Sequence, residues 1–370
     1  MIKYGYSPEI ILSLINYYKE SYMMVNRNGD FSKAFQSLIG VKQGGRASPS
    51  LFSIYLEEVL SEITAQKAGV KLSQIKIDVI AYADDIVVFS NTKKGLQELL
   101  NTIADFGRKY EIKFNPDKTL YMIFNNHIKR TVKECNEDRW QGELELDGKA
   151  IQKVKVFKYL GFDINDENND HDHIENRKKA AQKALSKLKN LDILTERTNP
   201  FLKGHLYKTY VMPVLTYGFE VLQLKKTVIN DIERYENNLI RNIYGIPKRC
   251  KMTNLKLINN LSITNNRIKR TQVDFFVRLL ENDYTKKIIK ELLSYSSNGN
   301  YVNGILDLLN NENLDIVQKC KAYNYFLDEE HKTNRKNNIV YDNLRKIFTE
   351  NNGNSQHIYN LLRFDNEIYK

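Results

Sequence analysis

The stretch "AYADDIVVF", Ala81 to Phe89, places two adjacent carboxylates inside an apolar, β-branched run, and this feature constrains the fold more than any other. Charge in an apolar setting is costly unless it is compensated, and neighbouring carboxylates also repel each other. The pattern predicts a β-hairpin with strands at 75–82 and 86–90 and with Asp84 and Asp85 near its tip. A solvated turn is one explanation of the two Asp residues, and a shared hard cation such as Mg²⁺ is the other.

The composition predicts a globular protein of two or three domains, since the chain has 370 residues of which 42% are hydrophobic. No stretch resembles a signal peptide or a membrane span, so we expect no membrane partner. Cys135, Cys250 and Cys320 lie far apart and give neither a disulfide framework nor a metal site. This pattern is typical of a reducing intracellular compartment, nucleus or cytoplasm, and predicts no disulfide-linked partner. His171 and His173 are expected in a solvated loop rather than at a metal.

The positive charge of the chain is concentrated in one block. Residues 166–290 carry 24 Lys and Arg against 14 Asp and Glu, a net charge of +10 out of +11 for the whole chain. A concentrated basic face is typical of a polyanion partner, whereas a solvated helical surface is the alternative.

The first 165 residues alternate helical and strand patterns. Helices are expected at 7–18, 48–63 and 95–110, and hairpin turns at Asn28-Gly29 and Asp147-Gly148. This mixture predicts an α+β fold. From about His173 onward the pattern is almost entirely helical, with Asn-rich breaks at 296–300 and 310–315.

Four blocks follow one another at spacings that identify a family. They are "GVKQGGRASPSLFSIYLEEVL" at 40–60, "AYADDIVVFS" at 81–90, "KFNPDKT" at 113–119 and "FKYLGF" at 157–162. In this order they resemble the reverse transcriptases of non-LTR (LINE-type) retrotransposons, which are right-hand polymerases with fingers, palm and thumb. Further downstream, "LYKTYVMPVLTYGFEVL" and "IERYENNLIRNIYGI" are similar to the helical thumb and the region after it. The resemblance covers Tyr4 to about Asp283.

The resemblance implies an RNA-directed DNA polymerase that uses two Mg²⁺ ions, an RNA template, a DNA primer and deoxynucleoside triphosphates. Asp84 matches the aspartate that binds both metals, with Asp85 beside it, and Gln43, Gly44 and Tyr82 match positions near the incoming nucleotide. Lys118 matches a lysine suggested to protonate the leaving pyrophosphate, although a solvated lysine is the alternative. The hairpin that positions the primer 3′ end, the primer grip, corresponds to Phe157, Lys158, Tyr159, Leu160 and Gly161.

The same resemblance divides the chain into a partial palm at 1–165, a basic helical thumb at 166–225 and a helical C-terminal region at 226–370. In the basic block, "NRKKAAQKALSKLK" predicts a helix with apolar residues for packing and with phosphate contacts from Arg177, Lys178, Lys179, Lys183 and Lys187.

Relatives carry a second metal-binding aspartate upstream, in a segment resembling F-x-D-x-x-x-A-F-D, and this chain begins "MIKYGYSPEI". We therefore expect an incomplete copy without fingers that is inactive alone. Three alternatives stay open: a partner chain that supplies the missing strand, a nucleic-acid-binding remnant without catalysis, and a group II intron-type reverse transcriptase or maturase, which shares "YADD".

Overall fold

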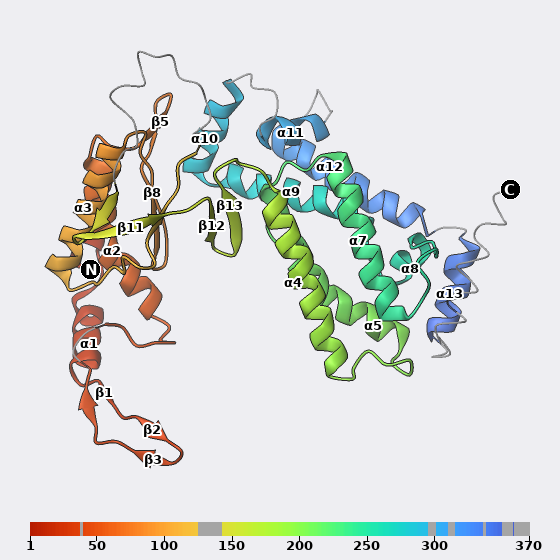
Figure 1. Ribbon diagram of the computed structural model, residues 1–370, viewed down its shortest axis with the longest axis horizontal. Coiled ribbons are helices and arrows are strands. Elements are labelled where there is room, and N and C mark those ends of the chain that lie inside the picture. The colour runs from red at the N-terminus through yellow and green to blue at the C-terminus, as the bar shows by residue number, and fades with distance from the viewer. Residues whose placement is uncertain are drawn as a thin grey trace. The chain divides into compact units, whose positions relative to one another are not determined.

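The computed structural model describes residues 1–37, 40–124, 143–294, 301–309, 315–335, 338–349 and Ile358. Cys135 and the Asn-rich segments 296–300 and 310–314 lie outside the described residues. The described chain divides into two compact units, one of residues 1–121 and 143–153 and one of residues 122–124 and 154 onward (Figure 1). Within the described ranges, no helix is both long and apolar enough to cross a bilayer.

The first unit begins with a short 3₁₀ turn (Ile2–Tyr4), helix α1 (Pro8–Lys19) and two small antiparallel ladders. Helix α1 starts after Ser7, whose hydroxyl accepts a hydrogen bond from the Ile10 amide and so caps the helix. β1 (Tyr22–Met23) pairs with β4 (Phe35–Gln36), and β2 (Asn26–Arg27) pairs with β3 (Asp30–Phe31). The predicted turn at Asn28-Gly29 is confirmed, because both residues have positive φ, at 53° and 101°.

The core of the first unit lies between α2 (Ser48–Ala65), α3 (Lys93–Tyr110) and the strands beside them. It buries Leu56, Val59 and Ile63 of α2 against Leu99, Leu100, Ile103, Ala104 and Phe106 of α3. β10 (Leu144–Leu146) pairs antiparallel with β11 (Lys149–Lys153), which pairs parallel with β9 (Leu120–Tyr121). β5 (Val70–Leu72) and β6 (Ile75–Ile77) form a separate antiparallel ladder. The helices predicted from their apolar spacing and the turn at Asp147-Gly148 are confirmed.

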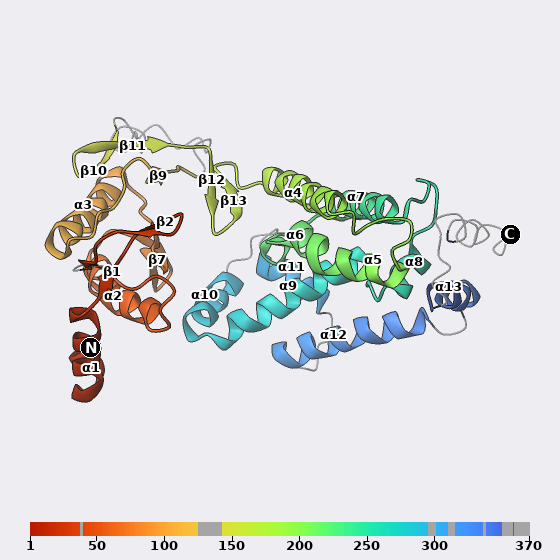
Figure 2. The ribbon, with the colours of Figure 1, turned by 90° about the horizontal axis from the view of Figure 1, so that it is seen from below.

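The second unit opens with the antiparallel hairpin β12 (Val156–Tyr159) and β13 (Phe162–Asn165) and is otherwise helical. Its helices are α4 (His171–Asn190), α5 (Pro200–Leu206), a π-turn (Tyr207–Val211), α6 (Met212–Thr216), a 3₁₀ turn (Phe219–Val221), α7 (Lys226–Tyr244), α8 (Thr253–Ile258), α9 (Thr264–Glu281), α10 (Asp283–Ser294), α11 (Tyr301–Leu308), α12 (Ile316–Thr333) and α13 (Ile339–Thr349). Helices α4 and α7 lie side by side (Figures 1 and 2). Mixed helices with small sheets agree with the α+β class.

The boundary between the units falls before the β12–β13 hairpin, whereas the sequence prediction ended the first domain at residue 165. Contacts between β13 and α4 explain this grouping. The Asn176 amide donates to the Asp163 carboxylate over 3.1 Å, and the Asp163 backbone N–H donates to His173 Nδ1 over 3.2 Å.

The predicted solvated loop at His173 is wrong. His173 lies in the first turn of α4 and is completely buried, while His171, two residues earlier, is exposed. The loop before the helix is ordered by hydrogen bonds between Asn165 and Asn169. Asn165 Nδ2 donates to the Asn169 carbonyl, and the Asn169 N–H donates to Asn165 Oδ1, both over 2.9 Å.

Candidate functional site

Asp84 and Asp85 lie at the tip of a β-hairpin, as predicted. Strand β7 (Val79–Tyr82) pairs with β8 (Asp85–Val88), and Tyr82 lies opposite Asp85 across the ladder. The two-residue turn consists of Ala83, in the left-handed region at φ 52°, and Asp84. Both carboxylates are exposed.

The predicted first strand, 75–82, is broken at Asp78. This residue is buried, with 6% of its surface exposed, and its carboxylate lies 2.8 Å from Lys76 Nζ. It also accepts a hydrogen bond of 2.9 Å from the Val79 amide. This buried carboxylate thus lies between β6 and β7 at the base of the hairpin, and sequence reasoning did not single it out.

The hairpin has one face toward the core and one face toward solvent, because side chains alternate along a strand and cross-strand partners share a face. Val79 and its partner Val88 pack against the core of the first unit. On the opposite face, Ile80 is 48% exposed and Tyr82 is 64% exposed. The apolar run is therefore covered on one face only, and Asp85 shares the exposed outer face with Tyr82.

The carboxylates of Asp84 and Asp85 are accessible to a hard cation, and that they bind one stays a prediction. Neither carboxylate makes a hydrogen bond or ion pair within the described residues. Mg²⁺ takes one or two carboxylates and completes its octahedron with waters and substrate phosphates, which an exposed tip leaves room for. Among all the residues that the structure describes, no group of three or more His, Cys, Asp or Glu side chains is placed to hold a metal ion.

The loop that contains Gln43 and Gly44 is held by a serine at the start of α2. The Ser48 hydroxyl donates to the Lys42 carbonyl over 2.6 Å, and the Gly45 N–H donates to the same carbonyl over 3.0 Å. A Cβ added at Gly45 would lie 2.6 Å from the Ser48 oxygen, so this close turn requires glycine. Gln43 and Gly44 are exposed beside it. That they lie close to Asp84 stays a prediction.

Lys118 is exposed in a tight turn just before β9. Asn115 orders this turn, because its side-chain oxygen accepts the Asp117 N–H over 3.0 Å and its carbonyl accepts the Thr119 N–H over 3.1 Å. The turn thus fixes the backbone at Lys118, while the proton-donor role of its side chain stays a prediction.

The predicted primer-grip segment, Phe157 to Gly161, forms β12 and the turn of its hairpin. Tyr159 pairs with Phe162, and the two turn residues Leu160 and Gly161 have φ of 48° and 82°. Positive φ at both central positions is the type I′ geometry that matches the twist of paired strands.

Tyr217 and His173 also belong to this site, and sequence reasoning missed them. The Tyr217 hydroxyl donates to the carbonyl of Leu160, which lies 57 residues away in the sequence. No local pattern in the sequence connects residues so far apart.

The five basic residues predicted for phosphate contact separate into two groups on α4. Lys179, Lys183 and Lys187, four residues apart, are exposed and form what we call the lysine face. Lys178 is 11% exposed and is held 2.7 Å from Glu175 and close to Asp231 of α7. Burial alone would lower the pKa of Lys178, but these two carboxylates outweigh it and raise the pKa. Arg177 lies with its guanidinium carbon 5.6 Å from the centre of the Tyr217 ring.

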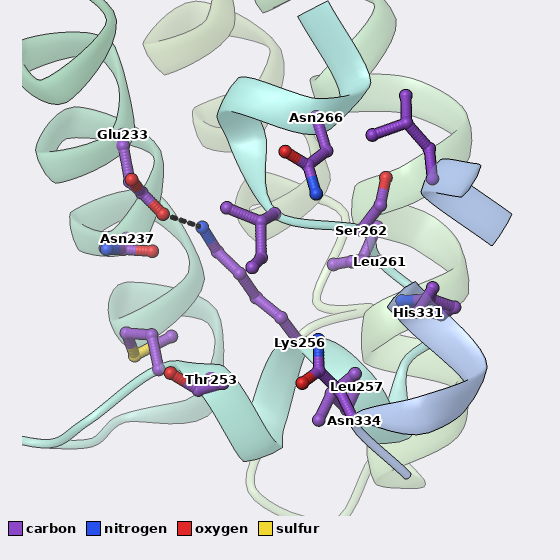
Figure 3. Close-up of a pocket in the computed structure, with 13 residues that line it drawn as sticks. Glu233, Asn237, Thr253, Lys256, Leu257, Leu261, Ser262, Asn266, His331 and Asn334 are labelled. Atoms are coloured by element: carbon purple, nitrogen blue, oxygen red, sulfur yellow. Dashed lines mark hydrogen bonds and ion pairs between the residues drawn. The ribbon is translucent and has the colours of Figure 1, made fainter. Parts of the chain in front are cut away.

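A pocket of about 160 Å³ lies among α7, α8, α9 and α12 (Figure 3). Lys256 projects into it from α8 and lies 3.3 Å from the Glu233 carboxylate. Its ammonium also donates to the Thr264 hydroxyl over 3.0 Å. The charges that line this pocket are therefore paired with each other.

Beside the pocket, Glu236 is completely buried in a polar network. Arg267 and the Tyr207 hydroxyl each contact its carboxylate over 2.6 Å. Burial would raise the pKa of Glu236, but Arg267 and Lys256 outweigh that effect and lower the pKa to about 2. We assign this network to the stability of the second unit, because its groups satisfy one another.

Comparison with known proteins shows what the segment that carries these features is similar to. Residues 7–164 match the model of the family described as reverse transcriptase (RNA-dependent DNA polymerase). The chain is 23% identical over 249 residues to the RNA-directed DNA polymerase from mobile element jockey of Drosophila melanogaster, a match that covers 65% of this chain and 26% of the relative.

Two further Drosophila melanogaster proteins show the same relationship. The Pol polyprotein from the type-2 retrotransposable element R2DM is 30% identical over 163 residues, which cover 44% of this chain and 15% of that protein. The probable RNA-directed DNA polymerase from transposon BS is 24% identical over 267 residues, 70% of this chain and 28% of that protein. The chain thus spans less than a third of the length of these relatives. Residues 7–164 thus match the reverse transcriptase family, and the chain is similar to the RNA-directed DNA polymerases of retrotransposable elements.

Proposed function

We propose that this chain contributes the catalytic hairpin of an RNA-directed DNA polymerase, which joins a deoxynucleoside triphosphate to the 3′ end of a DNA primer on an RNA template. The observation that supports this most is the pair of exposed carboxylates at the β7–β8 tip, within the segment that matches the reverse transcriptase family. We take residues 1–165 as palm and 166–225 as thumb.

In this proposal Asp84 and Asp85 hold two Mg²⁺ ions together with carboxylates from elsewhere in the complete site. Bound there, the cations would supply activation of the attacking 3′ oxygen and neutralisation of charge on the leaving pyrophosphate. Tyr82, on the same outer face of the hairpin as Asp85, contacts the incoming nucleotide with Gln43 and Gly44. Lys118 donates a proton to the pyrophosphate.

The nucleic acid is bound by the second unit. The lysine face of α4 lies opposite the buried side chains Ala181 and Leu185, so its three ammonium groups point toward solvent while the helix stays anchored. We propose that these groups contact backbone phosphates of the template–primer duplex, an interaction that is independent of base sequence.

The test is RNA-templated primer extension with Mg²⁺. The chain is assayed alone and fused at its N-terminus to a family fingers and palm segment that supplies a further carboxylate. We expect the fusion to extend the primer and Asp84→Asn to abolish extension, because two-metal transfer depends on charge and positioning. Asp30→Asn, a second exposed Asp beside a hairpin turn, is the matched control and should retain activity. Extension that survives Asp84→Asn, or no extension by either preparation, would refute the proposal.

A nucleic-acid-binding protein without catalysis is the second candidate, and the lysine face favours it independently of the hairpin. Two results together would select this alternative. Neither preparation extends the primer, and duplex binding requires the lysine face but is unchanged by Asp84→Asn.

A further inference from the structure

The turn of the β12–β13 hairpin holds a leucine in a backbone conformation that leucine rarely adopts. Leu160 has φ 48°, in the left-handed region, where a side chain with a Cβ is crowded against the following carbonyl oxygen. Such residues persist where their surroundings hold them, and they are common at functional sites. The question is what holds Leu160.

Tyr217 supplies two contacts to this turn. Its hydroxyl donates a hydrogen bond to the Leu160 carbonyl. Its ring also lies against the next residue, because a Cβ added at Gly161 would be 3.3 Å from the ring atom Cε1. Tyr217 therefore contacts both central residues of the turn.

Tyr217 is in turn fixed by two residues of helix α4. Its carbonyl accepts a hydrogen bond of 2.9 Å from His173 Nε2, which must carry the proton because a carbonyl can only accept. The guanidinium of Arg177 lies over its ring at 5.6 Å, a cation–π distance.

The backbone after Tyr217 is confined as well. Gly218 has φ 85°, and a Cβ there would lie 2.6 Å from His173 Nε2 and 2.7 Å from Phe162 Cδ2. Phe162 stacks on the His173 ring with centroids 4.1 Å apart. The β12–β13 hairpin, Tyr217 and the first turn of α4 are thus packed against one another through Phe162, Gly218 and His173.

We propose that Tyr217 is a positioning residue that fixes the Leu160–Gly161 turn relative to the lysine face of α4. The inference rests on the proposed function, in which the lysine face contacts the duplex backbone, and on the primer grip that the family resemblance implies at Phe157 to Gly161. Tyr217 itself contacts neither the reacting atoms nor the metal ions. It keeps the two contacts with the nucleic acid at a constant spacing, so that the 3′ end is placed when the backbone is bound.

The test compares two tyrosine variants of the full chain. Tyr217→Phe removes only the hydroxyl that holds Leu160. Tyr235→Phe is the matched control, because the Tyr235 hydroxyl also donates to a backbone carbonyl, that of Lys178 on α4, over 2.7 Å. Hydrogen exchange at 157–163 measures the order of the turn. Photo-cross-linking from the 3′-terminal nucleotide of a DNA primer on RNA measures its placement, and anisotropy measures duplex affinity.

We expect Tyr217→Phe to speed exchange at 157–163 and to lower cross-linking to the turn about fivefold, the effect of one typical hydrogen bond. Duplex affinity should stay within about twofold, because the lysine face is intact. Tyr235→Phe should change neither readout at the turn. Arg177→Met, which removes the cation from the Tyr217 ring, should also speed exchange at 157–163, and it serves as the exchange test if Tyr217→Phe fails to fold.

Unchanged hydrogen exchange at 157–163 in Tyr217→Phe would show that the Tyr217 hydroxyl does not hold the turn. Faster exchange with unchanged cross-linking would show that Tyr217 stabilises the turn but does not position the primer. No cross-link to the turn in the wild-type chain would refute the primer-grip role of the turn, and with it the primer part of this inference, whereas primer extension tests the proposed function separately. In that case the exchange data would still report on the contact between Tyr217 and the turn.

Discussion

Replacing the three residues of the lysine face by glutamine should change how duplex binding depends on salt. Lys179, Lys183 and Lys187 follow one another at about 6 Å along α4, since each residue rises about 1.5 Å. None of them makes an ion pair within the described residues, whereas Lys178 on the same helix is paired twice. The three ammonium groups are therefore available to phosphates along about 12 Å of nucleic acid.

The magnitude follows from counterion release. Each neutralised phosphate contributes about 0.7 to 0.9 to the slope of log affinity against log salt, so three contacts contribute about 2 to 3. Between 50 and 200 mM salt, a fourfold change, the wild-type chain should lose about 20- to 40-fold more affinity than the triple variant.

Fluorescence anisotropy with a labelled RNA–DNA primer–template measures this slope. The control is a second triple variant, Lys286→Gln with Lys287→Gln and Lys290→Gln, which removes the same charge from exposed positions of α10. We expect a distinctly smaller change of slope in the control. An equal change in both variants would show that only net charge matters, and no change in the first would remove the lysine face from the interface.

Two predictions concern stability. Glu236→Gln should destabilise the second unit by about 3 kcal/mol in thermal or denaturant unfolding, because it leaves buried cations without their carboxylate. Since the folded pKa of Glu236, about 2, lies below its unfolded value, the carboxylate stabilises fully above about pH 4.5 and loses this effect as the pH falls toward 2. The variant should therefore show a flatter acid dependence, and identical acid profiles would contradict the assignment. In the first unit, Phe106→Ala, at a side chain 1% exposed, should cost about 3–5 kcal/mol, while Phe31→Ala, 65% exposed, should cost under about 0.5 kcal/mol. Equal unfolding midpoints for these two variants would place Phe106 outside the core.

The hairpin turns could be predicted from sequence because their information is local. Asn28-Gly29 and Asp147-Gly148 adopt positive φ, which asparagine, aspartate and glycine tolerate best. Helix α2 could be predicted because its core residues Leu56, Val59 and Ile63 recur with helical spacing.

Features that depend on distant residues could not be predicted. The polar segment around His173 gave no sign that this side chain would be buried against Tyr217 and Phe162. Lys178 resembles its neighbours in sequence, but it is paired with Glu175 and with Asp231, which lies 53 residues later. The exposed outer face of the β7–β8 hairpin was missed for a related reason, because an apolar run does not indicate which of its faces will be covered.

Metal-directed cleavage of the backbone tests the central claim most directly, that the β7–β8 tip binds divalent cations beside the Gln43 loop. Iron(II) replaces Mg²⁺ at the site of the full chain, and ascorbate with peroxide then generates hydroxyl radicals next to the bound ion. The account predicts cuts beside Asp84 and Asp85 and a second group at Gln43–Gly44. Excess Mg²⁺ and Asp84→Asn should suppress both groups of cuts, while Asp30→Asn should leave them unchanged. Cleavage that avoids the tip, or that persists unaltered in Asp84→Asn, would contradict the account.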